Sequence, residues 1–154
     1  MRVQIVDPAA YTPPYDHALA GSLARAGAEV ELVTCEFPYG SVPREPGYEV
    51  TELFYRRSSA ASNPKVRRAL RAAEHVPGMR RHGRHARSAE VVHYQWLPIP
   101  RLDHRLLADV HPRVFTMHSR FPEPGSRTSR EEQWNVASSS NVQSNCSKFG
   151  LAVR

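Results

Sequence analysis

The segments Glu90-Val-Val-His-Tyr-Gln-Trp-Leu-Pro98 and Arg113-Val-Phe-Thr-Met-His-Ser-Arg120 decide the fold. Each contains a short apolar run, from Val91 to Leu97 and from Val114 to Met117. Runs of this length, ended by proline or polar residues, are typical of buried strands. Ligands of an open parallel sheet bind at the carboxyl ends of its strands, so the polar residues that end these runs are candidates for function.

The rest of the chain predicts three more strands, which makes five in all, and the helices between them. Strands are expected over 3–6, 30–34, 48–55, 91–96 and 114–117. One helix should begin at Asp16 and end before Gly27. A second should begin at Asn63-Pro64 and break at Pro77-Gly78. Its apolar face should be formed by Val66, Ala69, Leu70 and Ala73, and a short amphipathic helix should contain Leu102, Leu106 and Leu107.

This alternation predicts an α/β fold with a Rossmann-like, doubly wound parallel sheet and helices on both faces. We expect the strand order 3-2-1-4-5, which brings Asp7 to His17 opposite Gln95 to Pro98 at the topological switch point. Residues 1–130 should form this domain. Residues 131–154 are polar and poorly patterned, and are expected to be a truncated or frameshifted tail.

Length and composition limit the number of domains, the kind of partner and the location that can be expected of this chain. A chain of 154 residues allows one domain with a real core, and a net charge of +6 favours anionic partners. Cys35 and Cys146 form no Cys-x-x-Cys pair, which indicates free thiols in a reducing compartment. No signal peptide or membrane span is visible, so the expected location is cytoplasmic, at most peripheral at the inner membrane.

The loop after the first strand, Asp7-Pro-Ala-Ala-Tyr-Thr-Pro-Pro-Tyr-Asp-His17, contains no glycine. Without glycine the backbone cannot approach a pyrophosphate closely, which excludes a dinucleotide fingerprint, and a Walker loop is absent for the same reason. Tyr15, Asp16 and His17 could instead present side chains to a sugar or a lipid headgroup. A purely structural loop is the equal alternative.

His118, at the end of the last strand, is a candidate general base because the reference pKa of histidine lies near 6.5. A hydrogen-bonded structural histidine is the alternative, and His93, inside a strand, is expected to be packed. Gln95 and Trp96 lie where their strand ends. Trp96 belongs either to the core or, beside an amide, to a carbohydrate-stacking site.

A basic segment follows the third strand. It is expected to be either a solvated helix face or a contact with an anionic membrane, where each basic residue adds about 1 kcal/mol. Nucleic acid is not expected, because no aromatic residues are interleaved with the arginines. The membrane-surface candidates are Arg67, Arg71, Arg80 and Arg84.

Three segments together resemble the amino-terminal domain of GT-B glycosyltransferases of family 4. They are Ala18 to Thr34, Glu90 to Pro98, and Val114-Phe-Thr-Met-His-Ser119. The resemblance covers about residues 1–130.

The resemblance implies retaining, hexosyl-type transfer from a nucleotide-sugar donor without a metal. The first domain of such an enzyme holds a sugar or lipid-linked acceptor, and the second holds the nucleotide. His118 matches the family's histidine that contacts the donor sugar in the cleft, so it is the catalytic candidate. The substrate-binding candidates are Tyr15, Asp16, His17, Gln95, Trp96 and Ser119.

Two features depart from the family pattern. The glycine-rich first loop is replaced by Tyr11-Thr-Pro-Pro-Tyr15, and these residues contain no C-terminal donor-binding domain with a Glu-x7-Glu motif. We therefore expect an acceptor-binding half, inactive alone, with no cofactor of its own. The alternative is a non-catalytic α/β module that binds anionic lipid or a protein partner.

Overall fold

The computed structural model describes residues 1–37, 39, 40, 42 and 46–116. These residues belong to one compact unit, Met1–Thr116. Its elements are β1 (Arg2–Val6), α1 (Pro13–Arg25), β2 (Glu29–Thr34), β3 (Tyr48–Glu52), α2 (Arg56–Ser59), α3 (Pro64–His85), the 3-10 helix η1 (Ala86–Ser88), β4 (Val91–Tyr94), α4 (Pro100–Asp103) and β5 (Arg113–Phe115).

The five strands form one parallel sheet in the order β3-β2-β1-β4-β5. The predicted class and strand order are thereby confirmed: the domain is α/β and Rossmann-like. When helices cover both faces of a sheet, successive residues of a central strand are buried rather than alternately buried and exposed. Strand β1 has this pattern, with four buried residues in succession.

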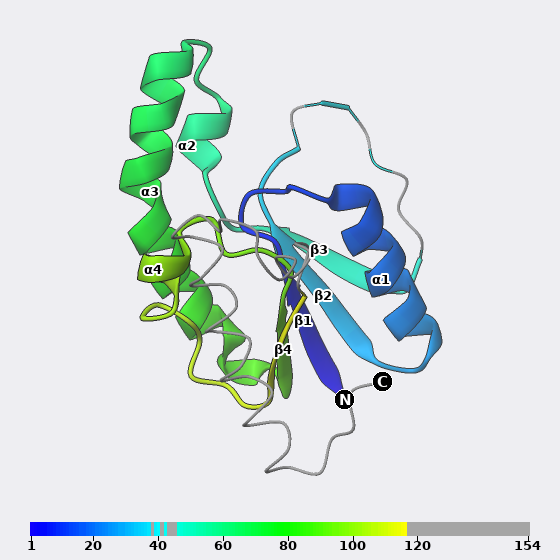
Figure 1. Ribbon diagram of the computed structural model, residues 1–154. Coiled ribbons are helices and arrows are strands. Elements are labelled where there is room, and N and C mark those ends of the chain that lie inside the picture. Colours follow the sequence, from blue (N-terminus) through cyan, green and yellow to red (C-terminus); the bar gives the residue numbers. More distant parts are fainter. Residues whose placement is uncertain (38, 41, 43–45, 117–154) are drawn as a thin grey trace, which may run out of the picture. The chain divides into compact units, whose positions relative to one another are not determined.

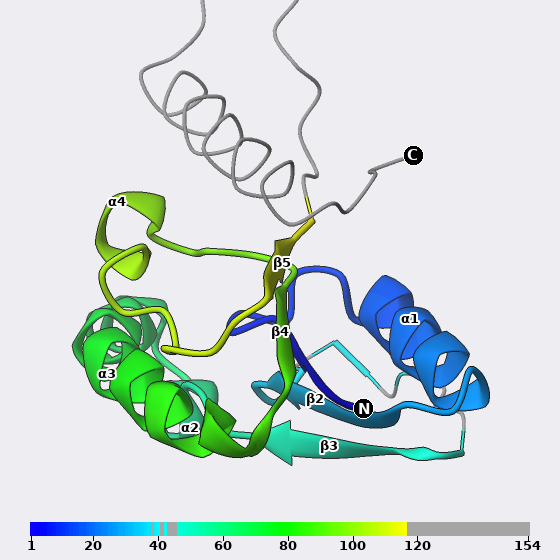
Figure 2. The same cartoon turned by 90° about the horizontal axis from the view of Figure 1, so that it is seen from below.

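Helices cover both faces of the sheet (Figures 1 and 2). Helix α1 packs on one face, where Ala20 meets Ile5 and Leu32. Helices α2, α3 and α4 lie on the other face, whose core includes Phe54 and Tyr94. Side chains alternate between the two faces along each strand, so Gln4 and Val6 point toward α3 while Val3 and Ile5 point toward α1.

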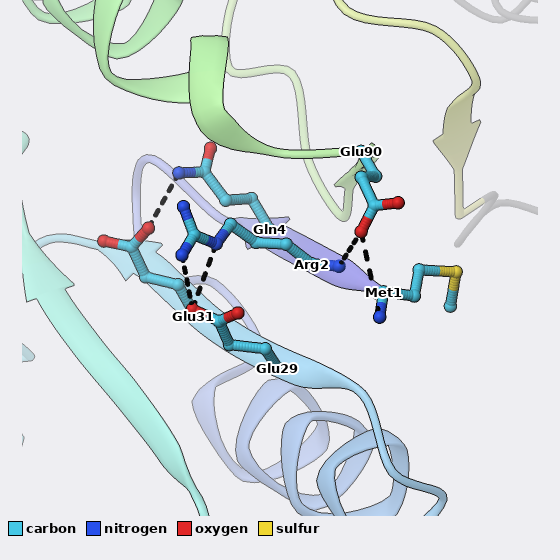
Figure 3. Close-up of polar contacts among 6 residues, drawn as sticks. All are labelled: Met1, Arg2, Gln4, Glu29, Glu31 and Glu90. Carbon is cyan, nitrogen blue, oxygen red and sulfur yellow. Dashed lines mark hydrogen bonds and ion pairs between the residues drawn. The ribbon is translucent and has the colours of Figure 1, made fainter.

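The amino-terminal edge of the sheet is closed by polar pairs (Figure 3). Arg2 donates to Glu29 at 2.7 Å, and its backbone N–H donates to Glu90 at 2.6 Å. Farther along the sheet, Gln4 Nε2 donates to Glu31 at 2.7 Å. The Arg2 and Glu29 side chains are exposed, so water and salt screen their pair and it contributes little to stability.

Glu31 is the centre of a more protected network on the α3 side. Besides Gln4, it accepts hydrogen bonds from Thr51 of β3 at 2.5 Å and from His85 of α3 at 2.7 Å. Burial alone would raise the pKa of Glu31, but these hydrogen bonds outweigh it and hold the pKa below its usual value. The carboxylate therefore joins β1, β2 and β3 to the end of α3.

Several element boundaries differ from the sequence prediction. Strand β4 ends at Tyr94 rather than at residue 96, and the short helix α4 contains Leu102 but neither Leu106 nor Leu107. Strand β3 ends at Glu52 rather than at residue 55, because the N–H groups of Leu53 and Phe54 both bond to the Thr34 carbonyl and turn the chain out of the ladder. Helix α1 begins at Pro13 rather than at Asp16. Proline suits the first helical turn, where its absent N–H would have no helical partner.

Helix α3 runs without interruption through Pro77 and Gly78, so the predicted break there is wrong. Its predicted apolar face is also wrong: Val66, Ala69 and Ala73 are exposed. The buried positions of α3 lie in its second half, namely His75, Gly78, Met79 and His82. The first half extends beyond the strand ends and has no sheet beneath it (Figure 1).

Candidate functional site at the carboxyl edge of the sheet

A row of polar residues follows the carboxyl ends of the strands on the α1 side. The backbone bonds Asp7 N–H to Val33, Gln95 N–H to Val6 and Thr116 N–H to Tyr94 each extend a ladder by one residue. With the pair formed by Thr34 and Glu52, this register aligns the row across all five strands. The members of the row are Glu52, Thr34, Asp7, Gln95 and Thr116.

The loop after β1 folds around the carboxylate of Asp7. Its two oxygens accept the backbone N–H groups of Ala9 at 3.2 Å, Tyr11 at 2.6 Å and Thr12 at 3.2 Å. Ala10 adopts a φ of 49°, in the left-handed region that costs a non-glycine residue about 1 kcal/mol. The N–H groups that a glycine-rich loop would offer to a phosphate are therefore used by the protein itself.

Asp16, one of the predicted substrate-binding residues, is buried beside Asp7. Burial raises its pKa to about 8, and the charge of Asp7 and a hydrogen bond with it act in the same direction. Thr12 Oγ1 contacts Asp16 Oδ1 at 3.4 Å. At neutral pH Asp16 is therefore mostly a neutral carboxylic acid, hydrogen-bonded to the Asp7 side chain.

The loops after β1 and β4 meet at the switch point, as predicted. Trp96 Nε1 donates to Thr12 Oγ1 at 3.1 Å, and the Tyr11 ring lies edge-on to Trp96 with centroids 5.3 Å apart. Tyr11 is 56% exposed and Tyr15, on the first turn of α1, is 51% exposed. Aromatic rings thus remain accessible beside the joined loops.

Gln95 is buried under this edge, with 1% of its surface exposed. Within the described part of the chain, neither its side-chain nitrogen nor its side-chain oxygen has a hydrogen-bond partner. A buried amide without partners costs about 1–3 kcal/mol. The position therefore carries a polar group that the fold itself does not use.

A cavity of about 330 Å³ opens between α1 and the carboxyl ends of β2 and β3. Its polar lining includes Asp16, Thr34, Cys35, Glu36 and Glu52. His17, also in the lining, hydrogen-bonds through Nδ1 to the Tyr48 hydroxyl at 2.6 Å. Glu36 and Glu52 are both exposed, so their side chains can accept hydrogen bonds from hydroxyl groups of a ligand.

A buried network of hydrogen-bonded side chains, which the sequence did not predict, lies on the α3 side of the same edge. The Tyr55 hydroxyl hydrogen-bonds to His75 Nδ1 at 2.6 Å, and His75 Nε2 hydrogen-bonds to Asp103 Oδ1 at 2.5 Å. The other Asp103 oxygen accepts the Ile99 N–H at 2.8 Å. Three elements, the turn before α2, α3 and α4, are joined by these bonds.

The four predicted membrane-surface arginines do not share one face of α3. With 3.6 residues per turn, Arg71 falls on the side of His75 and His82, whereas the exposed Arg80 and Arg84 fall on the opposite side. Arg67 is exposed near the start of the helix and donates to the Ala61 carbonyl at 3.1 Å. Arg71 is half-buried, with its guanidinium 4.9 Å from the centre of the Tyr55 ring.

Several predicted residues lie outside the described part of the chain. His118 and Ser119 do so, as do Cys146 and the predicted domain boundary at residue 130. His93 is packed as expected, with its Nε2 2.7 Å from the Thr116 hydroxyl. Among the described residues, no three or more His, Cys, Asp or Glu side chains are grouped to hold a metal ion, and no helix could cross a membrane.

Sequence reasoning missed Asp7, Tyr55, His75 and Asp103. An aspartate directly after a strand and before a proline is a recognisable turn signal, so Asp7 could have been found. The other three residues are 20 and 28 positions apart and belong to no local pattern.

Comparison with known proteins adds no family. A scan against models of known families finds no match to this chain, and no curated protein sequence matches it either. The structure therefore defines the class as a Rossmann-like α/β domain with a polar, aromatic-flanked carboxyl edge.

Proposed function

We propose that this domain is the acceptor-binding half of a GT-B glycosyltransferase of family 4, which binds a sugar-containing acceptor at the carboxyl edge of its sheet. The observation on which the proposal rests is the pairing of the two loops at the switch point. There Trp96 is fixed by Thr12 next to the exposed Tyr11 ring. Gln95, the residue before Trp96, is a buried amide whose side-chain atoms have no partner among the described residues. An aromatic face beside amide and carboxyl groups matches the alternating apolar and hydroxyl surfaces of a sugar.

The closed loop after β1 supports an acceptor rather than a nucleotide at this edge. Asp7 already occupies the backbone N–H groups of Ala9, Tyr11 and Thr12, so they are not free to donate hydrogen bonds to a pyrophosphate. The cavity beside α1 adds Glu36 and Glu52, which can accept hydrogen bonds from sugar hydroxyls. The nucleotide-sugar donor then needs a second domain. His118, which lies outside the described residues, remains the catalytic candidate through the family resemblance alone.

The proposal is tested with the 154-residue chain. The two tryptophans give two indole signals in an ¹⁵N NMR spectrum, and Trp96 is identified by Trp96→Phe. A panel of methyl glycosides and disaccharides should shift the Trp96 indole signal saturably, whereas UDP-glucose and GDP-mannose should not. Sugar transfer from either donor by this chain alone would overturn the half-enzyme assignment, as would a panel without any binder.

Two glutamines provide a matched pair of variants. Gln95 and Gln4 are each 1% exposed, but Gln4 lies mid-strand on the α3 side and donates to Glu31. Gln95→Met should weaken glycoside binding at least about tenfold, the cost of one lost hydrogen bond to a buried partner. Gln4→Met should leave binding unchanged within about twofold.

A second function, a non-catalytic module on an anionic membrane, is favoured by one observation. Arg80 and Arg84 are both exposed on the side of α3 that faces away from the core. Their substitution by glutamine together should then reduce co-sedimentation with phosphatidylglycerol vesicles and leave glycoside binding intact. Equal co-sedimentation of the variant and the wild type would exclude this function.

A further inference from the structure

Arg71 is a cation at the carboxyl edge that is not neutralised by the part of the chain the structure describes. Its guanidinium is half-buried over the Tyr55 ring, and no described carboxylate lies within ion-pair distance of it. A surface arginine usually remains mobile in water. This one has lost part of its hydration without gaining an anionic partner.

The nearby carboxylates are occupied by other groups. Asp103 is bonded to His75 and to the Ile99 N–H, and Asp7 accepts three backbone N–H groups. Glu74, one turn along α3, accepts the backbone N–H groups of Arg57 and Ser58, each at 3.0 Å. None of them is available to move onto Arg71 without breaking a bond of its own.

The platform beneath Arg71 is rigid. Tyr55 is held through its hydroxyl by His75, and it adopts a φ of 52°, a left-handed conformation that persists in a bulky residue only when its surroundings fix it. A guanidinium stacked on an aromatic ring keeps its N–H fork directed outward. The side chain is therefore pre-organised to donate two parallel hydrogen bonds.

The chain segment that leads to Arg71 is basic. From Arg56 to Arg71 the chain contains six basic residues and no acidic residue. These residues form α2 and the first two turns of α3, which pack against each other beside the strand ends (Figure 1). An anion at Arg71 would be attracted by the whole group.

Cys35 connects this region to the cavity. Its side chain lines the cavity on the α1 side, and it also lies close to Arg71. Burial raises the pKa of the Cys35 thiol to about 11, while the charge of Arg71 and a hydrogen bond with it act in the opposite direction. The thiol therefore stays neutral, and it gives the guanidinium a hydrogen-bond partner but no anionic one.

We propose that Arg71 binds a phosphate group, and that, if the domain holds a sugar acceptor as proposed above, the acceptor is a phosphorylated sugar. The sugar hydroxyls lie toward Glu36 and Glu52 and the phosphate lies across Cys35 on Arg71. Arginine binds phosphate through two parallel N–H donors, and such charge-assisted bonds are about twice as strong as neutral ones. The phosphate belongs either to a soluble sugar phosphate or to a lipid headgroup.

The test uses the 154-residue chain and two probes of the same chemistry. Inorganic phosphate and glucose 6-phosphate represent the soluble source, and phosphatidylcholine vesicles with or without phosphatidic acid represent the lipid source. Isothermal titration calorimetry measures binding of the soluble probes to the wild type and every variant, and co-sedimentation measures binding to vesicles. In the wild type, a shift of the Arg71 Nε–H signal in ¹⁵N NMR reports contact at this side chain. Arg71→Gln should weaken phosphate binding about tenfold or more. Arg71→Lys keeps the positive charge but not the two parallel N–H donors, so it should weaken phosphate binding less than Arg71→Gln does.

Arg80→Gln is the matched control, because it removes the same charge from the opposite side of the same helix and should change binding less than about twofold. Equal losses in Arg71→Gln and Arg80→Gln, with soluble probes or with vesicles, would mean diffuse attraction and overturn the site. Dependence on Arg71 with the soluble probes alone identifies a sugar phosphate, and dependence with vesicles alone identifies a lipid headgroup. If no phosphate binds while glycosides still shift Trp96, this site is excluded and the acceptor-binding proposal stands.

Discussion

Two buried glutamines show how single residues at this edge differ from those in the core. Gln4 uses its amide nitrogen to bind Glu31 and so joins β1 to β2. Gln95 has the same burial but no partner for either atom among the described residues. An unpaired buried amide lowers the stability of a fold. The presence of Gln95 at the carboxyl edge therefore has a stability cost, as is common at functional sites.

This difference predicts opposite stability effects for the same substitution. Gln95→Met removes an unpaired amide and should raise the free energy of unfolding by about 1 kcal/mol. Gln4→Met removes a donor from the Glu31 carboxylate and should lower it by about 2 kcal/mol. Urea denaturation at neutral pH measures both, and a decrease of equal size in the two variants would show that Gln95 is paired after all.

At the scale of elements, α3 shows where local sequence rules fail. Pro77 and Gly78 together predict a helix end, and alone they would produce one. In the folded protein, Gly78 lies against the buried Phe54 ring, and Met79 and His82 complete the contact with the sheet. Packing in the second half of the helix thus outweighs the roughly 3 kcal/mol that an internal proline costs.

The same two positions should respond oppositely to alanine. Pro77 is exposed, so Pro77→Ala should raise the free energy of unfolding by about 1–2 kcal/mol, the helix gain less the added entropy of the unfolded chain. A Cβ at position 78 would meet Phe54 Cδ1 at 3.1 Å, and this ring is held between Tyr55 and His82. Gly78→Ala should therefore destabilise the protein by about 1 kcal/mol. Thermal unfolding measures the change in stability of both variants. Stabilisation by Gly78→Ala would show that the Phe54 ring can move away from the added Cβ.

For the whole molecule, the strand order and the meeting of the loops after β1 and β4 were predictable from the sequence. Strands β1, β2 and β4 have short apolar runs, and 3-2-1-4-5 is one of the two common orders of a doubly wound sheet. Right-handed crossovers alone do not distinguish it from 2-1-3-4-5. The bonds that shape the edge were not predictable. Asp7 reaches Asp16 nine residues away, and Tyr55, His75 and Asp103 meet only because α3 and α4 pack on the same face. Such contacts depend on tertiary structure and leave no periodic signal.

Two buried titratable groups on opposite faces give the whole domain an unusual dependence of stability on pH. Asp16 keeps its proton up to about pH 8 in the folded protein but loses it near pH 3.8 when unfolded, so its contribution to stability falls as pH rises through this interval. His82 is packed between Phe54 and Tyr94, and burial lowers its pKa from 6.5 to about 4. Its contribution therefore rises with pH from about 4 to 6.5.

The two slopes are opposite in sign and each amounts to about 1.4 kcal/mol per pH unit. We expect them to cancel from pH 4 to 6.5, and the free energy of unfolding to fall by about 2 kcal/mol from pH 6.5 to 8, where Asp16 acts alone. In Asp16→Asn the free energy should instead rise from pH 4 to 6.5 and then stay level, and in His82→Leu it should fall throughout. Urea denaturation across this range measures all three profiles. Parallel profiles of wild type and Asp16→Asn above pH 6.5 would mean that Asp16 is already ionised in the folded protein.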